Sequence, residues 1–308
     1  MRAVVLFNPK AGSAGGADGF CAAVEDHPDL TLVQPETAEG LDAAVRQAAE
    51  EGADVVASAG GDGTLHAVAN ALARLPVRAE ELPALAVIPF GTGNDFARTL
   101  AIPTDPDAAL DLLHAGERRP IDLIRVNPDD GPALYAINAC TGGFSGQVEE
   151  VLTDDLKKTW GPLAYLIGGI KVIPDLTEYD TRLAYDGGPD EPEDAFNVVV
   201  GNGRMAGGGK PIAPKANPED GLLDVVVIRR CSGPQMAALA ALAFAGDYLQ
   251  SDLVVHRRVQ QLRVASKPGM WFNVDGELLT NAPITFEAVP QALRVVVGPE
   301  YAAAVDDA

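Results

Sequence analysis

Three apolar runs in the first ninety residues each end in a loop rich in glycine, threonine or asparagine. AVVLF (3–7) precedes NPKAG, DVVASAG (54–60) precedes GDGT, and ALAVIP (84–89) precedes FGTGND. Runs this short and apolar indicate strands buried on both faces. Because segments of helical character separate them, we predict an α/β domain with a parallel sheet covered on both sides. The three loops would then gather at the carboxyl edge of the sheet, where such proteins bind ligands.

The alternation also gives approximate element positions in the first domain. We expect strands at 3–7, 30–34, 54–60 and 82–91, and helices near 16–26, 41–51, 65–75 and 95–100. After about residue 120 the pattern changes to short β-rich runs with turn residues between them, which is typical of an antiparallel sandwich or barrel. Two helical segments, 151–173 and 234–249, interrupt these runs.

The chain length allows two domains. It has 308 residues, 47% of them hydrophobic, and domains hold roughly 150 residues each. We place an α/β domain at 1–121 and an all-β sandwich domain at 122–290. The last strand, 293–298, is expected to return to the first domain.

Charge and cysteine content exclude several classes of protein. A net charge of −21 disfavours nucleic-acid binding and broad adsorption to anionic lipid, both of which rest on Lys and Arg. Three widely spaced cysteines form neither a disulfide framework nor a metal cluster. No signal-peptide pattern is seen, and the apolar stretch 236–245 is shorter than the ~18–20 residues that span a bilayer. We expect a cytoplasmic protein with no transmembrane segment.

The glycine loops have the chemistry of phosphate sites. Backbone N–H groups exposed at a helix N-terminus bind anions, and threonine hydroxyls add donors. A plain strand-to-helix turn is the alternative for GGDGT taken alone, because Gly permits positive φ and Asp caps helices. The chain has no GxxxxGK[ST] sequence, so it is not a Walker-type protein. GNGRMA (201–206) matches a dinucleotide fingerprint, but the following GGGKPIAP cannot begin a helix, and we interpret it as a glycine turn.

Taken in order, NPKAG, GGDGTLHAVAN and PFGTGNDFAR resemble the diacylglycerol kinase catalytic domain of the soluble bacterial lipid kinases. These are relatives of sphingosine and ceramide kinases and, more distantly, of NAD kinases. LKKTWGPLAYLIGGI (156–170), residues 201–228 and NVDGE (273–277) resemble that family's later motifs, so the likeness covers nearly the whole chain. The resemblance implies an NAD-kinase-like α/β domain with ATP bound between the two domains.

The resemblance also implies which residues contact ATP. They lie in the three loops and at one further threonine: Asn8, Pro9, Lys10, Ala11, Gly12, Thr37, Gly61, Asp62, Gly63, Thr64, Leu65, His66, Thr92, Asn94 and Asp95. Asp62 matches the aspartate near the phosphates and their Mg²⁺. One departure is Ala67, where the family usually has glutamate.

A second Mg²⁺ region is implied by NPEDGLLD (217–224). The family's structural ion would be held by Asn217, Asp220 and Leu222, with Asp224 as a rival ligand. Oxygen ligands at such a turn suit Mg²⁺. From spacing alone, an Asp-Gly hairpin turn explains the same residues.

The final motif supplies carboxylates for catalysis. If NVDGE is a strand, Asp275 and Glu277 share one face and point into one cleft. A lipid hydroxyl needs a carboxylate to accept its proton, and the resemblance places the base here, with Glu277 as acceptor and Asp275 as partner. An exposed D-G-E turn is the alternative from spacing alone.

These features predict an ATP- and Mg²⁺-dependent lipid kinase that converts diacylglycerol to phosphatidic acid. Its lipid substrate would be met at the membrane surface, so that the protein is peripheral to the membrane, and a homodimer is possible. The basic residues Lys157 and Lys158, with Trp160, begin a helix that is either part of the core or lipid-facing. Alternatives for the function are a kinase for a sphingoid base or phosphatidylglycerol, and a non-catalytic nucleotide-binding regulator.

Overall fold

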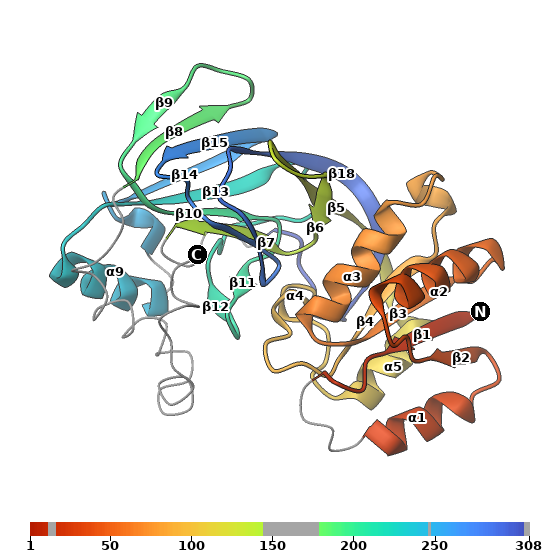
Figure 1. The fold of residues 1–308 in the computed structure, drawn as a ribbon. Coiled ribbons are helices and arrows are strands. Elements are labelled where there is room, and N and C mark those ends of the chain that lie inside the picture. The colour runs from red at the N-terminus through yellow and green to blue at the C-terminus, as the bar shows by residue number, and fades with distance from the viewer. Residues whose placement is uncertain (12–16, 144–178, 246–247, 305–308) are drawn as a thin grey trace.

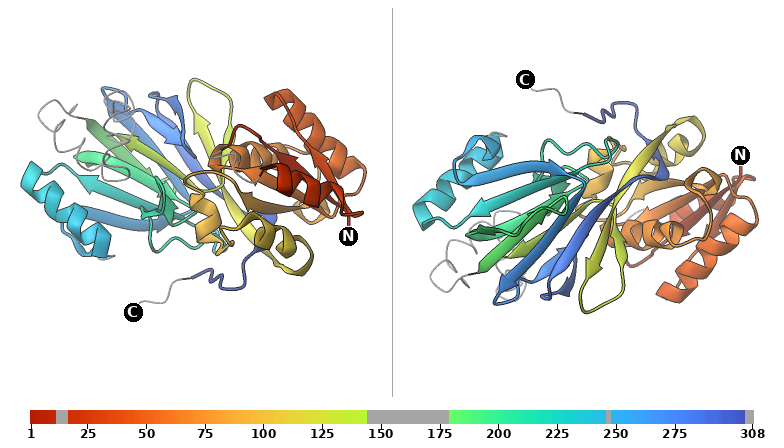
Figure 2. Two further views of the ribbon diagram at one scale, coloured as in Figure 1. Left: turned by 90° about the horizontal axis from the view of Figure 1, so that it is seen from below. Right: turned by 90° about the horizontal axis from the view of Figure 1, so that it is seen from above.

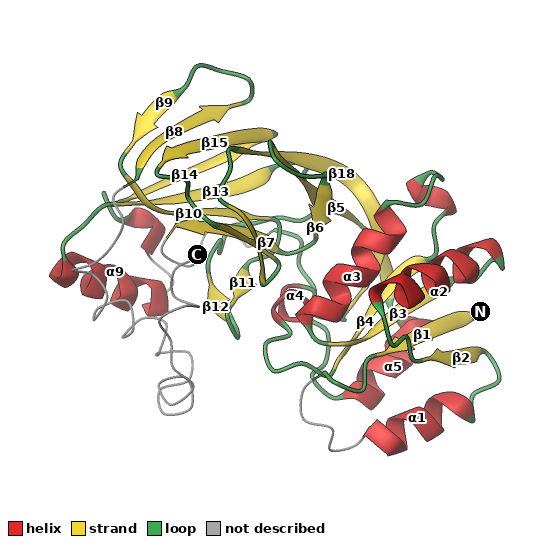
Figure 3. Cartoon of the chain, in the orientation of Figure 1, coloured by secondary structure: helices red, strands yellow, loops and turns green. Residues whose placement is uncertain are grey.

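The computed structural model describes residues 1–11, 17–143, 179–245 and 248–304. The predicted helix at 151–173, with Lys157, Lys158 and Trp160, and the predicted ligand Gly12 lie outside these residues. Most helices gather at one end of the molecule, and the other end consists of strands with α9 (Gly233–Ala245) beside them (Figure 3). The views from below and above place the N-terminal α/β part and the strand-rich part side by side (Figure 2).

The first part is the predicted parallel sheet. Its strands run in the order β2 (Leu30–Val33), β1 (Ala3–Phe7), β3 (Val55–Gly60) and β4 (Ala84–Pro89), and all three pairings are parallel. β1, β3 and β4 are buried at every position because helices cover both faces. α2 (Ala38–Glu50) and α3 (Asp62–Ala73) pack together on one face, and α1 (Ala17–Glu25) and α5 (Pro106–Ala115) lie on the other (Figure 1).

Two of these helices begin earlier than predicted, and the reason is local. Thr37 caps α2 by accepting a hydrogen bond from the Gly40 N–H at 3.1 Å, so the helix begins at Ala38 rather than near residue 41. α3 begins at Asp62, directly after the glycines of GGDGT, rather than near residue 65. The short α4 (Asp95–Thr99) begins directly after Asn94 in the second glycine loop.

The second part is a β-sandwich. One layer has the antiparallel order β14 (Val254–Val259), β13 (Leu223–Arg229), β10 (Ala195–Gly201), β7 (Ala139–Gly143), β16 (Phe272–Val274) and β17 (Glu277–Thr280). The other layer continues the first sheet beyond β4 through β18 (Ile284–Val297), β15 (Gln261–Lys267), β8 (Asp180–Tyr185) and β9 (Glu191–Glu193). Apolar side chains from both layers, including Val200, Val225, Phe272 and Phe286, form the core between them.

Two long strands connect the α/β part and the sandwich. β18 pairs in parallel with β4 through Val295 and Leu85, while its first residues pair with β15. β5 (Glu117–Pro128) pairs with β18 in antiparallel orientation. It also pairs with β6 (Leu134–Ala136). The predicted boundary at residue 121 therefore falls inside one continuous strand. This continuity fixes the two parts relative to each other.

Smaller elements complete the sandwich. α9 (Gly233–Ala245) packs on Val199 and Val226 through Leu239. The hairpin of β11 (Met205–Ala206) and β12 (Lys210–Pro211) extends toward the α/β part. Over the residues described, no helix is long and apolar enough to cross a membrane.

Candidate active site

The two glycine loops after β3 and β4 lie against each other. A Cβ atom on Gly91 would lie 2.5 Å from the Cα of Gly61, a distance that real side chains do not adopt. The contact follows from the register of the sheet, because Gly60 pairs with Pro89 at the ends of the neighbouring strands. Asn94 then closes the second loop: its side chain accepts from the Gly91 N–H at 3.0 Å and donates to the Gly91 carbonyl at 2.6 Å.

A cavity of about 950 Å³ opens beside the loop after β3, at the carboxyl edge of the parallel sheet. The N-termini of α2 and α3 both face it, and the loop after β1 forms a third wall. Its lining includes many of the predicted nucleotide residues, namely Asn8, Pro9, Lys10, Ala11, Thr37, Gly61, Gly63 and Thr64, together with Ala67. Asn8 donates to the Thr64 hydroxyl at 3.1 Å, which joins the first loop to the second.

Other predicted nucleotide residues lie elsewhere. The side chain of Leu65 is buried in the core of the α/β part, so only its backbone could reach a ligand. Thr92 is exposed on the second glycine loop, and Asn94 is engaged with Gly91. Asp62, His66 and Asp95 face the sandwich instead of this cavity.

Asp62 and Asp95 bring two carboxylates close together at the first turns of α3 and α4. Asp62 accepts a hydrogen bond from the Asp95 N–H at 2.8 Å, and oxygens of both side chains flank Gly93. Burial, followed by the charge of Asp95, raises the pKa of Asp62, although hydrogen bonds from backbone N–H groups partly oppose the rise. Two carboxylates in this arrangement suit a hard cation such as Mg²⁺, which takes one or two carboxylates and completes its shell with phosphate and water oxygens.

Asp95 also contacts the sandwich. Its two oxygens accept from the backbone N–H groups of Gly208 and Gly209, in the turn between β11 and β12. These glycines have φ of 83° and 85°, which only glycine adopts readily. A second cavity of about 400 Å³ lies here, between Asp62 and Asp95 on one side and Asn273, Asp275 and Lys210 on the other.

Asp275 sits in a turn rather than in a strand, so the expectation that Asp275 and Glu277 share one strand face is wrong. Val274 pairs with Glu277, and the two residues between them have φ of 47° and 99°, which makes Asp-Gly a two-residue hairpin turn. The Asp275 side chain is 2% exposed. Glu277, in contrast, is exposed and lines the 950 Å³ cavity.

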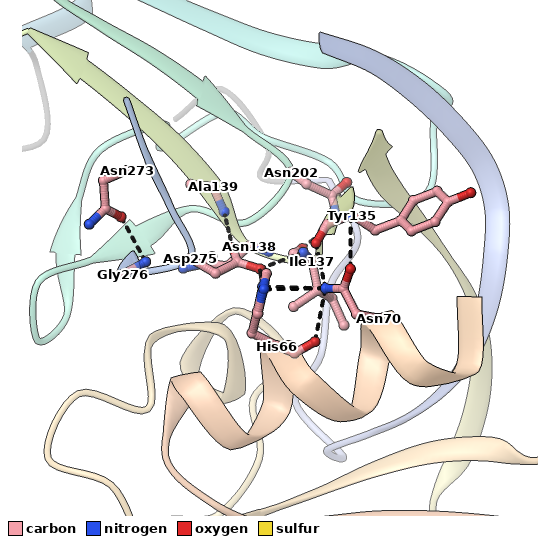
Figure 4. A network of polar contacts seen from close by, with 10 residues as sticks. All are labelled: His66, Asn70, Tyr135, Ile137, Asn138, Ala139, Asn202, Asn273, Asp275 and Gly276. Carbon is pink, nitrogen blue, oxygen red and sulfur yellow. Dashed lines mark hydrogen bonds and ion pairs between the residues drawn. The ribbon is translucent and has the colours of Figure 1, made fainter. Parts of the chain in front are cut away.

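The Asp275 carboxylate is surrounded by donors (Figure 4). Oδ1 accepts from the backbone N–H groups of Asn138 at 3.0 Å and Ala139 at 2.9 Å. Oδ2 accepts from the Ile137 N–H at 2.8 Å and lies 2.9 Å from Nδ1 of His66. Four donors therefore occupy the two oxygens and compensate the buried charge.

His66 and Asn70 extend this network along α3. Asn70 donates to the Tyr135 carbonyl at 2.6 Å and accepts from the Tyr135 N–H at 2.9 Å, so that its amide pairs with β6 (Figure 4). Burial lowers the pKa of His66, but the hydrogen bond and charge of Asp275 and the charge of Glu277 raise it, and the net shift is upward. Our sequence interpretation placed His66 in the nucleotide loop and gave Asn70 no role. The sequence contains a signal for this network, because polar residues at 62, 66 and 70 lie four apart in a helix that is apolar elsewhere except at Gly63 and Thr64.

In the predicted second Mg²⁺ region, the side chains of Asn217 and Asp220 have partners within the protein. Oδ1 of Asn217 accepts from the Glu219 N–H, and Oδ1 of Asp220 accepts from the Leu222 N–H, both within the turn. The other oxygen of Asp220 forms an ion pair with Arg258, which already supplies a positive charge. Among the residues with described positions, no group of three or more His, Cys, Asp or Glu side chains is placed to hold a metal ion.

Comparison with known proteins agrees with this architecture. Residues 2–126 match the diacylglycerol kinase catalytic domain, and residues 138–297 match the YegS C-terminal NAD kinase beta sandwich-like domain. A "Probable lipid kinase YegS-like" from Stenotrophomonas maltophilia (strain K279a) is 39% identical over 254 residues, which is 82% of this chain and 81% of that protein. A protein of the same name from Pseudomonas aeruginosa (strain PAO1) is 40% identical over 255 residues, covering 82% of this chain and 79% of its own length.

Solved structures share the fold. A candidate diacylglycerol kinase from Bacillus anthracis str. Sterne superposes with a TM-score of 0.80 at 24% identity and covers 98% of both chains. Yeast NADH kinase, solved with NADH, superposes with a TM-score of 0.57 at 11% identity, covering 97% of this chain and 84% of its own. The predicted α/β domain followed by a β-sandwich is confirmed, as is the resemblance to the diacylglycerol kinase catalytic domain. The chain belongs to the YegS-like lipid kinases.

Proposed function

We propose that this lipid kinase transfers the γ-phosphoryl group of ATP to the primary hydroxyl of diacylglycerol, in the presence of Mg²⁺, to give phosphatidic acid at the membrane surface. One observation carries the proposal: Glu277 of the sandwich faces the same cavity as the glycine loops of the α/β domain. A proton acceptor and a phosphate-binding surface thus line one space.

The α/β side is suited to the nucleotide phosphates. Gly61, Gly63 and Thr64 lie at the N-terminus of α3, where backbone N–H groups lack partners within the helix and attract anions. Lys10 lines the opposite wall and adds a positive charge to a site that must hold several negative ones. Phosphoryl transfer depends mainly on such positioning and charge stabilisation.

Asp62 and Asp95 are the residues that would hold the Mg²⁺ of the nucleotide. Their mutual repulsion, which contributes to the raised pKa of Asp62, is relieved when a cation lies between them. Bound Mg²⁺ neutralises charge on the phosphate oxygens. Through such an ion the two aspartates would orient the nucleotide phosphates at the first turns of α3 and α4.

The contrast between the two carboxylates of DGE favours Glu277 as the base. Four donors occupy the oxygens of Asp275, so taking up a proton there would disrupt the hydrogen bonds that hold the turn. Glu277 is exposed at the cavity. It accepts the proton of the acceptor hydroxyl while the hydroxyl oxygen bonds to the γ-phosphorus. The bond from that phosphorus to the bridging oxygen breaks, and ADP leaves.

The test is a panel of acceptors with one pair of variants. Purified protein is incubated with labelled ATP, Mg²⁺ and mixed micelles of diacylglycerol, a sphingoid base or phosphatidylglycerol. We expect labelled phosphatidic acid, and a loss of about 10²–10⁴-fold in Glu277→Gln, the usual contribution of a general base. Glu300→Gln, at an exposed glutamate outside both cavities, is the control and should match the wild type.

The panel also separates the alternatives. Product from phosphatidylglycerol or a sphingoid base but not from diacylglycerol would replace the proposed acceptor and keep the mechanism. ATP binding without turnover of any acceptor, unchanged in Glu277→Gln, would favour a nucleotide-binding regulator and contradict the proposal.

A further inference from the structure

α3 presents a polar stripe to the sandwich. Asp62, His66 and Asn70 follow one another at intervals of four residues, and residues so spaced lie on one helix face. The rest of the helix is largely apolar and buried. The three side chains form hydrogen bonds with different parts of the site. Asp62 contacts α4, His66 contacts the Asp275 turn, and Asn70 contacts β6.

The imidazole ring of His66 forms a hydrogen bond with Asp275. His66 is 8% exposed, and its Nδ1 lies 2.9 Å from Oδ2 of Asp275. An ionised carboxylate can only accept, so Nδ1 carries the proton and donates it to this bond. His66 is not among the described residues that line the 950 Å³ cavity. A role at Asp275 therefore accounts for the ring better than a contact with the nucleotide.

The turn that His66 holds leads directly to Glu277. Only Gly276 separates Asp275 from Glu277, and its N–H donates to Oδ1 of Asn273 at 2.7 Å. The three backbone donors to Asp275 all belong to residues 137–139 of the sandwich, which Asn202 supports through a 2.7 Å bond to the Ile137 carbonyl. They fix the turn within the sandwich. The bond from His66 fixes it relative to α3.

We propose that His66 is a positioning residue of the kinase, which sets the Glu277 carboxylate at its working distance from the phosphate-binding end of α3. The proposal rests on the proposed function and deepens it, since it needs Glu277 to be the proton acceptor. The physical reason is geometric. The loop that holds the donor phosphate and the turn that holds the base belong to different domains, and displacements of about 1 Å cost up to about 10²-fold in rate.

Two substitutions separate this role from others. In His66→Asn, the amide Nδ2 occupies nearly the place of the imidazole Nδ1 and can still donate to Asp275. His66→Leu keeps apolar bulk and removes the donor. We expect kcat to fall about 10- to 100-fold in His66→Leu, with KM for ATP within about twofold of the wild type, and His66→Asn to recover most of the loss.

A matched control is available in the sandwich. His256 Nε2 lies 2.7 Å from Oδ1 of Asp224, whose side chain is 1% exposed, so this is a second pair of a histidine with a buried aspartate. Neither residue lines either cavity described above. His256→Leu should lower stability as His66→Leu does and leave kcat unchanged. An equal fall of kcat in both variants would reduce the effect to general destabilisation and overturn the proposal.

A measurement without substrate tests the positioning role of His66 separately from the proposed kinase function. Amide hydrogen exchange at residues 137–139 and 276 should become faster in His66→Leu, stay near the wild type in His66→Asn, and be unaffected by His256→Leu. Unchanged exchange in His66→Leu, or a raised KM for ATP with normal kcat, overturns the positioning role. Wild-type protein that phosphorylates no lipid overturns the proposed function, whereas the exchange measurement still tests the link between His66 and the turn.

Discussion

Two groups of carboxylates face the 400 Å³ cavity, and they differ in how their charge is compensated. On the α/β side, Asp62 and Asp95 lie close enough that the charge of Asp95 raises the pKa of Asp62. On the sandwich side, Asp275 is surrounded by three backbone N–H groups and His66. Although Asp95 accepts hydrogen bonds from the N–H groups of Gly208 and Gly209, the first arrangement keeps a repulsion between two carboxylates that a bound cation would relieve. The second needs no ligand and holds a turn in place.

This difference separates residues that bind from residues that position. A carboxylate with repulsion from a neighbour gains stability when a cation arrives, so its removal should affect activity more than folding. A buried carboxylate with four donors is part of the folded structure, so its removal should affect folding directly. Four measurements test this distinction, and the effects that we expect decrease from the first to the last.

Asp275→Asn should produce the largest loss of stability. The substitution places an amide against four donors and leaves some of them buried without an acceptor, which typically costs about 3–5 kcal/mol of unfolding free energy. Urea unfolding measures it. Asp186→Asn is the control: Asp186 has φ of 51° in an exposed turn, a conformation that Asn tolerates, and the expected change is within about 0.5 kcal/mol. Equal losses of unfolding free energy in the two variants would show that the four hydrogen bonds to Asp275 contribute little to stability.

Asp62→Asn should reduce activity without reducing stability. If Asp62 is a ligand of the nucleotide's Mg²⁺, as we propose, its loss removes transition-state stabilisation worth several kcal/mol, which corresponds to about 10²-fold or more in rate. At neutral pH the raised pKa of Asp62 means that its ionised form destabilises the folded state, and the neutral amide removes this cost. Melting in the absence of Mg²⁺ should therefore be unchanged or slightly higher. A clear fall in melting temperature would place Asp62 with Asp275 as a structural carboxylate.

Mg²⁺ should stabilise the wild type through Asp62 and Asp95. Binding to the folded state alone adds about 2.7 kcal/mol when the free ion is at one hundred times its dissociation constant. We expect a rise in melting temperature with Mg²⁺ that is absent in Asp62→Asn. A rise that persists in that variant and disappears in Asp220→Asn would instead reveal a Mg²⁺ site in the 217–222 turn, contrary to its ion pair with Arg258.

The pH dependence of stability should reflect His66, with the smallest effect. Its folded-state pKa is raised above the unfolded value of about 6.5. The resulting stabilisation is fully present below about pH 6.5 and is lost as the pH rises through the folded-state pKa. Besides Asp275, the charges of Glu277 and Arg74 act on the ring. Between pH 6 and 9, the unfolding free energy should decline more steeply with pH for the wild type than for His66→Asn. The same pH dependence in both proteins would contradict the raised pKa of His66.

Much of the geometry of the glycine loops was predictable because it depends on local sequence. A buried parallel strand followed by glycines places backbone donors at a helix start, and this holds for GGDGT and GTGND wherever the strands lie in the sheet. Predicting the contact between Gly61 and Gly91 also requires knowing that β3 pairs with β4. The Asp-Gly turn was also visible in the sequence, since this dipeptide favours a two-residue hairpin turn. The turn was the alternative to a strand over 273–277, and the structure shows the turn, with the side chain of Asp275 buried.

The order of apolar runs and turn residues was sufficient to predict the α/β domain and the β-rich second half, because burial and turn formation act over a few residues. The kinase family came from the resemblance of the glycine-loop motifs and the later motifs to a known family. That Asp275 has hydrogen-bond donors on both carboxylate oxygens while Glu277 is exposed could not be predicted from the sequence. It depends on contacts between distant residues, such as His66 and Asp275, which are 209 positions apart. The same holds for Asp220, whose role depends on Arg258 from a neighbouring strand. Charge compensation is set by three-dimensional proximity, and only the folded chain brings those partners together.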